Sequence, residues 1–258
     1  MDTSREPPDN LPELKPGDAF CFNCTPHTPC FNRCCAELAL PLTPHDCLRL
    51  RRHFNAVSED LLRRFTTMRH YPDTGFPLPM LRMLDGPGEP CPFVTPAGCS
   101  VYEDRPGACR CYPLGRGAAM GKTGVDERVF VVREDHCLGF DHGDARTPMQ
   151  WFAEQEVTAY NASNDRYMRL MALTRATGKP LDPRLASMSL LCLFQLDKFR
   201  ELITRMGIFD RVEADDRQDA IMEDSLAGDE AALDFALDWM ELAIFGVCPT
   251  LCRTQNHD

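Results

Sequence analysis

CPFVTPAGCSVYEDRPGACRCYP, residues 91–113, carries four cysteines in a segment rich in proline and glycine. A second cysteine block, CFNCTPHTPCFNRCC, lies upstream at residues 21–35 and ends in the adjacent pair Cys34-Cys35. Proline and glycine favour turns, so both blocks are expected to be mainly loop, where ligands from separate segments can converge. Thiolate is a soft ligand, so this grouping predicts a site for zinc, copper(I) or an iron–sulfur cluster.

The composition bounds the class of protein. The chain has 258 residues and 43% hydrophobic content, which suggests one large domain or two small ones with a buried core. The fourteen cysteines follow a polar, proline-rich start, MDTSREPPDNLPELKPGD, which does not resemble a basic-then-apolar secretion signal. A cytoplasmic location is therefore expected. In a reducing cytosol, clustered cysteines indicate metal ligands or catalytic thiols rather than disulfides.

Charge and hydropathy narrow the range of partners. The formal net charge is −11, which argues against nucleic acid, because such binding needs clustered positive charge. The longest apolar runs, such as residues 190–194, are too short to span a bilayer, so no membrane partner is expected. A protein partner is compatible with the sequence, which does not identify one.

Three ranges of the chain differ in character. Residues 1–16 are charged and proline-rich and are predicted to form a flexible leader. Residues 17–146 are predicted to form a cysteine-cluster metal-binding domain, and residues 147–258 a helical C-terminal region. The expected fold class is mainly α with irregular cysteine-rich loops and a small β element. In this fold, the Cys-cluster domain is followed by a helical bundle.

Local signals predict the first elements. Thr43-Pro44-His45-Asp46 places a capping hydroxyl before a proline at the first helical position, so a helix is expected from here. A second helix start lies at Ser58. ERVFVVR, residues 127–133, is an apolar β-branched run that predicts a strand. Phe93-Val94 and residues 100–102 are expected to pair with this strand in a small sheet.

The C-terminal region is predicted to be helical. A capping box with proline at the first helical position begins at Thr147, and the helix is expected to run to Leu173. Apolar residues at 192, 196, 199, 203 and 206 have helical spacing and predict one buried stripe on a helix that ends at Gly207. A last helix is predicted over residues 229–245, with Gly246 closing it.

Cysteine spacing bears on the kind of metal. Structural zinc uses paired C-x2–4-C knuckles in sets of four ligands. Cys21 and Cys24 fit one knuckle, and Cys30 and Cys34 fit another loosely. The later block has wide, irregular intervals on loops, which favour an iron–sulfur cluster, because thiolates must surround a body wider than one ion. The same spacing is also compatible with a polynuclear zinc site.

The same residues resemble a known family. Phe22-Asn23-Cys24, then Cys30 and Cys34-Cys35, are followed by a Leu-Thr-Pro step at 42–44. CPFVTPAGCSVYEDRPGACRCYP is similar to the pattern C-P-F…C-x-[IV]-Y-E-x-R-P-x-x-C-R-x-Y-P, and Cys137-Leu138-Gly139 resembles the closing C-x-G. These are motifs of the YkgJ-type, or CxxCxxCC, cysteine-cluster family of zinc- or iron-chelating domains. The resemblance spans residues 22–139.

The resemblance implies a ligand pool. This chain departs from the compact C-x2-C-x2-C-C pattern in its Cys24–Cys35 intervals, and Cys21 and Cys111 stand where the family does not usually have cysteine. Eight thiols would saturate two four-coordinate centres or overfill one. The implied ligands are Cys24, Cys30, Cys34, Cys35, Cys91, Cys99, Cys109 and Cys137.

The positions of the other cysteines and of one histidine indicate different roles. Cys47 and Cys192 lie within predicted helices and are expected to fill the core. Cys248 and Cys252 have metal-compatible spacing but no nearby partner in the sequence, so a structural role is favoured. Among the histidines, His136 is the best candidate for an additional ligand, with a solvated or capping role as the alternative.

Side chains around the later block have two interpretations. Arg105 and Arg110 are candidate cofactor-binding residues that hydrogen-bond cluster sulfur or a bound anion. Alternatively, Arg105 pairs with a neighbouring acid and fixes a turn. Tyr102 and Tyr112 are expected to pack and to shield the site.

Three functions of different classes follow. The first is a metal-binding protein with a thiolate-ligated centre, an iron–sulfur cluster of the 4Fe-4S kind or zinc, in a redox, sensing or metal-handling role. The second comes from the resemblance: part of this family is known as flagellin lysine N-methylase and looks like a user of S-adenosylmethionine. The third is a structural zinc-binding interaction module. The sequence identifies no catalytic residue.

Overall fold

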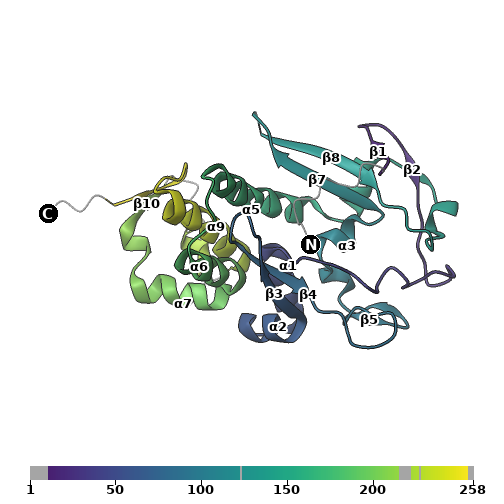
Figure 1. The fold of residues 1–258 in the computed structure, drawn as a ribbon, viewed down its shortest axis with the longest axis horizontal. Helices are drawn as coiled ribbons and strands as arrows, with labels where there is room; N and C mark the ends of the chain where they lie inside the picture. The colour runs from purple at the N-terminus through teal and green to yellow at the C-terminus, as the bar shows by residue number, and fades with distance from the viewer. Residues whose placement is uncertain (1–10, 123, 215–221, 227, 255–258) are drawn as a thin grey trace. The chain divides into compact units, whose positions relative to one another are not determined.

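The computed structural model describes residues 11–122, 124–214, 222–226 and 228–254 (Figure 1). The fold is mixed α/β, with 44% of the described residues helical and 18% in strands, so the expected mainly-α class is too narrow. The strands form one three-stranded sheet and several two-stranded pairs. Short hairpins satisfy backbone groups in loop-rich segments, and composition alone does not reveal them.

Two compact units share the chain. One contains the residues up to Pro41 together with Met80–Asp165, and the other contains Leu42–Pro79 together with the residues from Arg166 onward. We call them the cysteine unit and the helical unit. They divide the chain differently from the predicted ranges 17–146 and 147–258. Leu42–Pro79 belongs to the helical unit because α1 (Pro44–Phe54) packs against α6 (Pro183–Phe194) and α9 (Asp229–Phe245).

The cysteine unit is built around a three-stranded antiparallel sheet in the order β1-β8-β7. The predicted strand at 127–133 is confirmed as β8 (Val125–Val131), and it pairs with β7 (Leu114–Met120). Its other neighbour, β1 (Glu13–Leu14), lies within the predicted leader. The expected pairing of Phe93-Val94 and residues 100–102 with this strand is wrong. The segment instead folds on itself as a hairpin of β5 (Val94–Thr95) and β6 (Gly98–Cys99).

The sequence did not indicate β7 because LGRGAAM has no β-branched or aromatic residue. Its small residues are explained by the facing side chains. A Cβ on Gly115 would lie 3.2 Å from Val132 Cγ2, and one on Gly117 would lie 3.2 Å from Phe130 Cε2. Glycine here leaves room for the partner strand's large side chains, and strand propensity is overridden by packing.

An aromatic core lies next to the first cysteine block. It consists of Phe20, Phe22, Leu114, Val129 and Trp151, with Tyr112, Cys137 and Phe140 packed against it. The Phe22 ring meets Phe140, Trp151 and Tyr112 edge-on at centroid distances of 5.2, 5.7 and 5.8 Å. Phe20 is held in β2 (Phe20–Cys21) by pairing with β9 (Ala145–Arg146). Edge-on aromatic pairs favour a fixed geometry, so this core anchors the start of the cysteine loop.

The remaining helices of the cysteine unit are short. They are η1 (Tyr102–Asp104), α3 (Gly107–Cys111), η2 (Gly139–Asp141) and α4 (Pro148–Glu154). The predicted capping box at Thr147 is confirmed, since its side chain accepts from Gln150 N. The predicted single helix to Leu173 is broken, however. A second helix, α5 (Thr158–Ala176), begins after Glu156, whose φ of 53° is left-handed.

The helical unit contains α1, α2 (Ser58–Phe65), α6, α7 (Leu196–Met206), α9 and the later part of α5. It also contains β3 (Thr66–His70), most of β4 (Pro77–Leu81), η3 (Phe209–Arg211) and the pair of β10 (Val212–Ala214) and β11 (Leu251–Arg253). The predicted Thr43 cap is confirmed as a capping box with Asp46. The last helix has its predicted bounds, and Gly246 closes it at φ 74°.

The predicted stripe from Cys192 to Met206 spans two helices rather than one. α6 ends at Phe194 and α7 begins at Leu196, with Gln195 outside helical geometry at ψ 61°. Cys192, Phe199 and Ile203 are buried as expected, whereas Met206 is 44% exposed. Gly207 ends α7 with a φ of 55°, as predicted.

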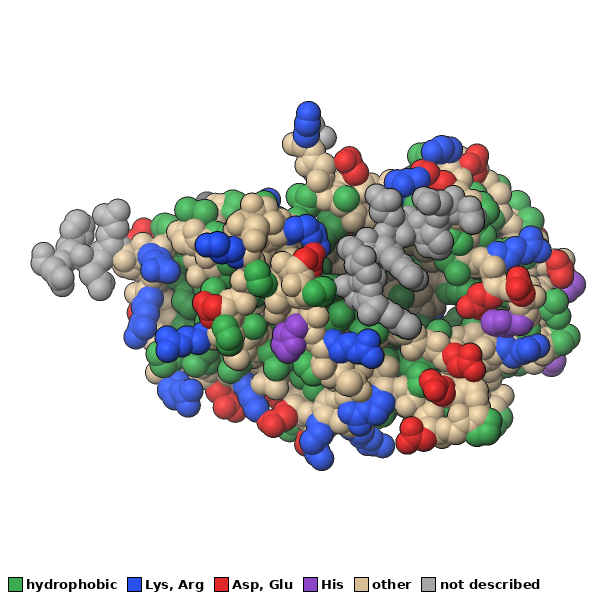
Figure 2. All heavy atoms as spheres, viewed as in Figure 1, with side chains coloured by type: hydrophobic (Ala, Val, Ile, Leu, Met, Phe, Trp, Pro, Cys, Tyr) green, Lys and Arg blue, Asp and Glu red, His purple; other side chains and the backbone are tan. Residues whose placement is uncertain are grey.

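The surface of the molecule carries charged side chains of both signs (Figure 2). Acidic and basic side chains are interspersed on the face drawn in Figure 2. Many of them form ion pairs, such as Arg116 with Asp165 at 2.7 Å. Within the part of the chain that the structure describes, none of the helices has the length and apolarity needed to cross a bilayer.

Candidate metal centre

All eight implied ligands lie in the cysteine unit. They come from three places: the loop of residues 24–35, the segment of residues 91–109, and Cys137 just before η2. Cys30 and Cys91 are buried, Cys24 and Cys109 are exposed, and the other four are half-buried. The structure holds the cysteines as thiols and not as disulfides. The donor set is therefore available for soft-metal binding.

Two backbone contacts bring Cys137 to the first block. Asn23 N donates to Gly139 O at 2.9 Å, and Leu138 N donates to Cys30 Sγ at 3.2 Å. Burial, together with the nearby charges of Cys34, Cys30 and Cys137, raises the pKa of the Cys24 thiol to about 11. We call Cys24, Cys30, Cys34 and Cys137 the first thiol set. Its members crowd one another electrostatically, as expected of ligands that a cation would neutralise.

A different pair of contacts brings the second block to Cys35. Cys91 N donates to Cys35 O at 2.9 Å, and Ala36 forms an antiparallel bridge with Pro90. The hydrogen bond with Cys34, burial, and the charges of Cys34, Cys91 and Cys109 raise the pKa of Cys35 above its usual range. Burial first and then the charge of Cys99 raise the pKa of Cys91. We call Cys35, Cys91, Cys99 and Cys109 the second thiol set.

The adjacent pair Cys34-Cys35 joins the two sets. A hydrogen bond from the Cys35 thiol lowers the pKa of Cys34 to about 7, despite its burial. This shift favours the thiolate form of Cys34, which is the form that binds metal. The unusual feature of the sequence, two neighbouring cysteines, thus has a structural counterpart in a thiol–thiolate pair.

Oxygen and nitrogen atoms border the first set. Tyr112 Oη donates to Glu134 Oε2 at 3.3 Å, and His136 Nε2 lies 3.3 Å from the same oxygen. Burial, followed by hydrogen bonding with Cys137 and the charge of Glu134, raises the pKa of Tyr112. Its ring packs on Phe22 as expected, but its hydroxyl meets the thiols. Glu134 was missed in the sequence, where its only signal was a place three residues before Cys137.

Arg105 is buried, and its guanidinium donates hydrogen bonds to other groups of the protein. It donates to Tyr102 O and, at 2.6 Å, to Gln155 Oε1, and its guanidinium lies 3.9 Å from the Tyr102 ring centroid. Its charge also reaches Cys99, where it opposes the rise in pKa caused by burial. The structure thus supplies a turn-fixing role for Arg105 and a weak electrostatic link to the second set.

Arg110 is 3% exposed and spans three segments. It donates to Glu103 O and, at 2.8 Å, to Gln155 O, and it lies 4.9 Å from the Tyr160 ring centroid. The carbonyl of Gln155 is accessible because α4 ends there. The break that interrupts the predicted long helix is therefore the docking point of a buried cation from the cysteine-rich segment.

The other cysteines lie apart from these contacts. Cys21 is exposed on β2, and Cys111 is buried beneath Trp151, whose Nε1 donates to its carbonyl at 3.0 Å. Cys47 and Cys192 are 3% and 0% exposed in α1 and α6, in agreement with the predicted core role. In the helical unit, Cys248 Sγ lies 3.3 Å from Thr250 Oγ1, and Cys252 Sγ donates to Glu213 O at 3.7 Å.

The eight cysteines lie in one unit, but their thiols do not converge on a single point. Among the described residues, no three His, Cys, Asp or Glu side chains converge tightly enough to hold a metal ion as they stand. Metal binding therefore requires the thiols to move, for example by rotations about their Cα–Cβ bonds. Such rotations are feasible because these cysteines lie on loops and hairpin ends rather than within long helices. The donor chemistry fits zinc or an iron–sulfur cluster.

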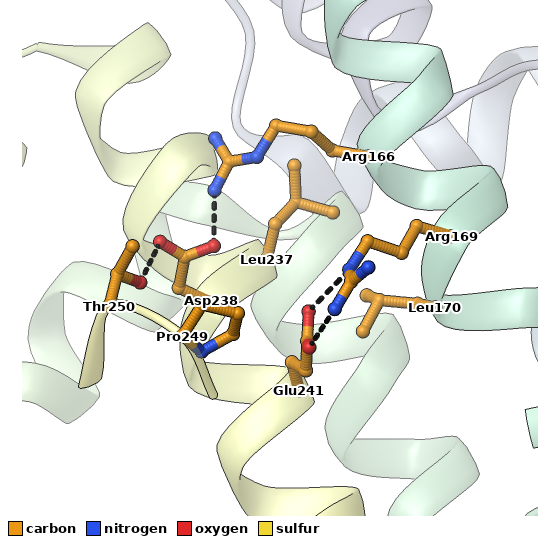
Figure 3. Close-up of a pocket in the computed structure, with 8 residues that line it drawn as sticks. All are labelled: Arg166, Arg169, Leu170, Leu237, Asp238, Glu241, Pro249 and Thr250. Carbon is orange, nitrogen blue, oxygen red and sulfur yellow. Dashed lines mark hydrogen bonds and ion pairs between the residues drawn. The ribbon is translucent and has the colours of Figure 1, made fainter. Parts of the chain in front are cut away.

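The helical unit has a separate pocket of about 100 Å³ (Figure 3). Arg169 pairs with Glu241 at 2.8 Å, Arg166 pairs with Asp238, and Thr250 donates to Asp238 at 2.7 Å. The charged side chains that line the pocket are thus paired with one another. This arrangement ties α5 to α9 and to the segment before β11.

Gly139→Ala is expected to destabilise the cysteine unit by about 1–3 kcal/mol, the usual cost of overpacking. A Cβ at this position would lie 2.5 Å from Phe22 Cε2 and 3.1 Å from Asn23 O. Urea unfolding monitored by aromatic circular dichroism measures the loss. In a Phe22→Leu background the same substitution should cost less, since the clashing ring is gone. Equal costs in both backgrounds would contradict the role of this contact.

Part of the chain is similar to a known family. Residues 23–138 match the model of the CxxCxxCC family, described as "Putative zinc- or iron-chelating domain". The matched range contains all eight implied ligands. Neither the curated proteins nor the solved structures gave a match to this chain.

Proposed function

We propose that the eight gathered cysteines ligate an iron–sulfur cluster, because residues 23–138 match the model of the CxxCxxCC family, described as a "Putative zinc- or iron-chelating domain". Metal binding in general follows from the family. The iron–sulfur form, of the 4Fe-4S kind, is the proposal. The observation that carries it is the meeting of Cys35 with Cys91, through Cys91 N to Cys35 O at 2.9 Å, although 56 positions separate them.

Three features favour a cluster over a single zinc ion. The ligands come from several directions on irregular loops, as a body wider than one ion requires. The thiol pool exceeds the four ligands that one structural zinc accepts. Exposed Cys24 and Cys109 leave a path from solvent to each thiol set, which suits redox exchange or metal transfer. An iron–sulfur cluster held there would supply one-electron redox chemistry.

The chain's own residues have defined tasks in this proposal. The eight thiols bind, and the aromatic core around Phe22 fixes the start of the loop that carries Cys24 and Cys30. Arg110 clamps the segment between Cys99 and Cys109 to the end of α4, through Glu103 O and Gln155 O. Tyr112 and Glu134 hold a proton between oxygens at the edge of the first set. A redox, sensing or metal-handling role follows from these parts.

Anaerobic purification followed by assays for iron, acid-labile sulfide and zinc tests the proposal. We expect brown protein that contains iron and sulfide in equal amounts and that bleaches reversibly with a reductant. A colourless protein that retains stoichiometric zinc and no sulfide would instead identify a structural zinc module. A Cys21→Ser/Cys252→Ser variant is the matched control, because both thiols are exposed and lie outside the two sets.

A further inference from the structure

The pocket of the helical unit brings buried leucines and charged side chains together around one cavity (Figure 3). Leu170 and Leu237 are 1% and 2% exposed, and Asp238 and Glu241 are each 8% exposed. The cavity has a volume of about 100 Å³. Because a cavity of about 150 Å³ takes a molecule the size of benzene, this one has room for a smaller organic molecule.

Stability alone does not explain the charges around this cavity. Arg166 pairs with Asp238, and Arg169 pairs with Glu241. The free energy that two charges lose on leaving water is barely offset by their pairing, so apolar side chains of similar volume stabilise a core as well or better. An apolar cavity with a few convergent polar groups is instead typical of a site that binds and orients a small molecule.

The guanidinium of Arg169 has two donors that its partner does not use. Arg169 meets Glu241 side-on, with Nε donating to Oε2 at 3.2 Å and Nη2 donating to Oε1 at 2.8 Å. A guanidinium has five N–H donors, so the end formed by Nη1 and Nη2 offers two further parallel N–H groups. Among the described residues, none accepts a hydrogen bond from Nη1. The side chain is 40% exposed, so a carboxylate can bind this end bidentately while Glu241 stays in place.

The two buried carboxylates can accept further hydrogen bonds. Asp238 accepts from Arg166 through Oδ1 and from Thr250 through Oδ2, and Glu241 accepts one hydrogen bond on each oxygen. Each carboxylate oxygen has two lone pairs, so both side chains keep capacity for an ammonium group. The charge balance also favours a cation here, because Asp234 shares Arg166 and makes three carboxylates against two guanidinium groups.

We propose that this pocket binds a small zwitterion of the α-amino-acid class, the size of glycine or alanine. The carboxylate of the ligand binds the free end of Arg169, and its ammonium group binds Asp238 and Glu241. Both ligand charges are then paired, and the ion pairs of the protein stay intact, which avoids the cost of a buried unpaired charge. This activity is separate from the metal centre, since every lining residue lies in the helical unit.

Titration calorimetry of the full-length protein, purified without oxygen, tests the proposal with ligands of matched size. L-Alanine is the probe, propionate lacks its ammonium group, and ethylamine lacks its carboxylate. We expect saturable binding of L-alanine and at least about tenfold weaker binding of the other two, because each leaves buried polar groups of the pocket unpaired. Propionate or ethylamine that binds as tightly as L-alanine would overturn the zwitterion class. The absence of saturable binding by both L-alanine and glycine would overturn the site.

Two variants locate the binding on α5. Arg169→Lys keeps the charge but loses the parallel N–H donors, so L-alanine should bind at least about tenfold more weakly. Arg175→Lys is the matched control, because Arg175 lies on the same helix but pairs with Asp73 at 2.7 Å and does not line the pocket. Unchanged affinity in Arg169→Lys would contradict the proposed carboxylate contact. The comparison of the three ligands on the wild-type chain decides the question if a variant does not fold.

Discussion

Removal of the bound metal is expected to release the cysteine loops while the helical unit stays folded. Structural thiolate sites contribute about 10–16 kcal/mol to small zinc domains, so this is the largest single effect that we expect. The loops at residues 24–35 and 91–111 contain short turns, two-residue strands, the three-residue η1 and the five-residue α3. Burial, followed by the charges of Cys34, Cys30 and Cys137, raises the pKa of Cys24 to about 11, so without a cation these thiols would repel one another on ionisation.

Hydrogen exchange with and without a chelator measures this effect. Peptides that cover the two cysteine loops should exchange faster after metal removal, whereas peptides from α6 and α9 serve as an internal reference. Strands β7 and β8 have a continuous ladder from Leu114↔Val131 to Met120↔Val125 and should change less. Loops whose exchange is insensitive to the chelator would show that the metal contributes nothing to their order.

Arg110→Ala is expected to destabilise the cysteine unit by about 3 kcal/mol or more. Each hydrogen bond to a charged group is worth about 1.5–3 kcal/mol, and two carbonyl acceptors lose their donor. The side chain is 3% exposed, so water replaces it poorly. It also lies 4.9 Å from the Tyr160 ring centroid, and that contact is lost with it.

Urea unfolding of metal-loaded protein measures the cost, with two controls. Arg110→Lys keeps the charge but not the planar fork, so it should recover only part of the stability. Arg63→Ala removes a guanidinium that is 76% exposed and pairs with Asp60 on the surface, so its effect should stay below about 1 kcal/mol. A similar loss in Arg110→Ala and Arg63→Ala would show that the buried clamp is unimportant.

The same variants also distinguish the two interpretations of this arginine. A residue that acts only on Glu103 O and Gln155 O changes stability but leaves the visible spectrum of the centre intact. A residue that contacts cluster sulfur shifts that spectrum in the folded protein. We expect the first result, because the guanidinium of Arg110 donates to the backbone carbonyls of Glu103 and Gln155.

Local chemistry accounts for what the sequence predicted well. The Thr43 cap, the Thr147 capping box and the last helix closed by Gly246 depend on neighbouring residues and are found as expected. Tertiary contacts account for what was wrong. The helix break at Gln155–Glu156 is where a distant arginine docks, and the partner of β8 is a glycine-rich strand whose small residues fit facing side chains.

At the candidate site, too, local sequence predicted some features, and others depend on tertiary contacts. The cysteines were evident from their spacing and from a family resemblance, and the structure brings them into one unit. Their assignment as ligands stays a prediction. The grouping into two sets could not be predicted, because it depends on backbone contacts between Cys35 and Cys91 and between Asn23 and Gly139. The position of the Tyr112 hydroxyl also could not be predicted, because it depends on tertiary contacts with Glu134 and Cys137.

The path of the chain limits how this protein can be dissected. It leaves the cysteine unit after Pro41, re-enters at Met80 and leaves again after Asp165. A fragment that ended at residue 146 would carry α1 and α2 without α6 and α9, and so would expose the apolar face of α1. No single truncation isolates either unit. Excision of residues 42–79, whose flanking residues Pro41 and Met80 are already bridged, together with truncation after Asp165 is the natural route to a minimal metal-binding domain.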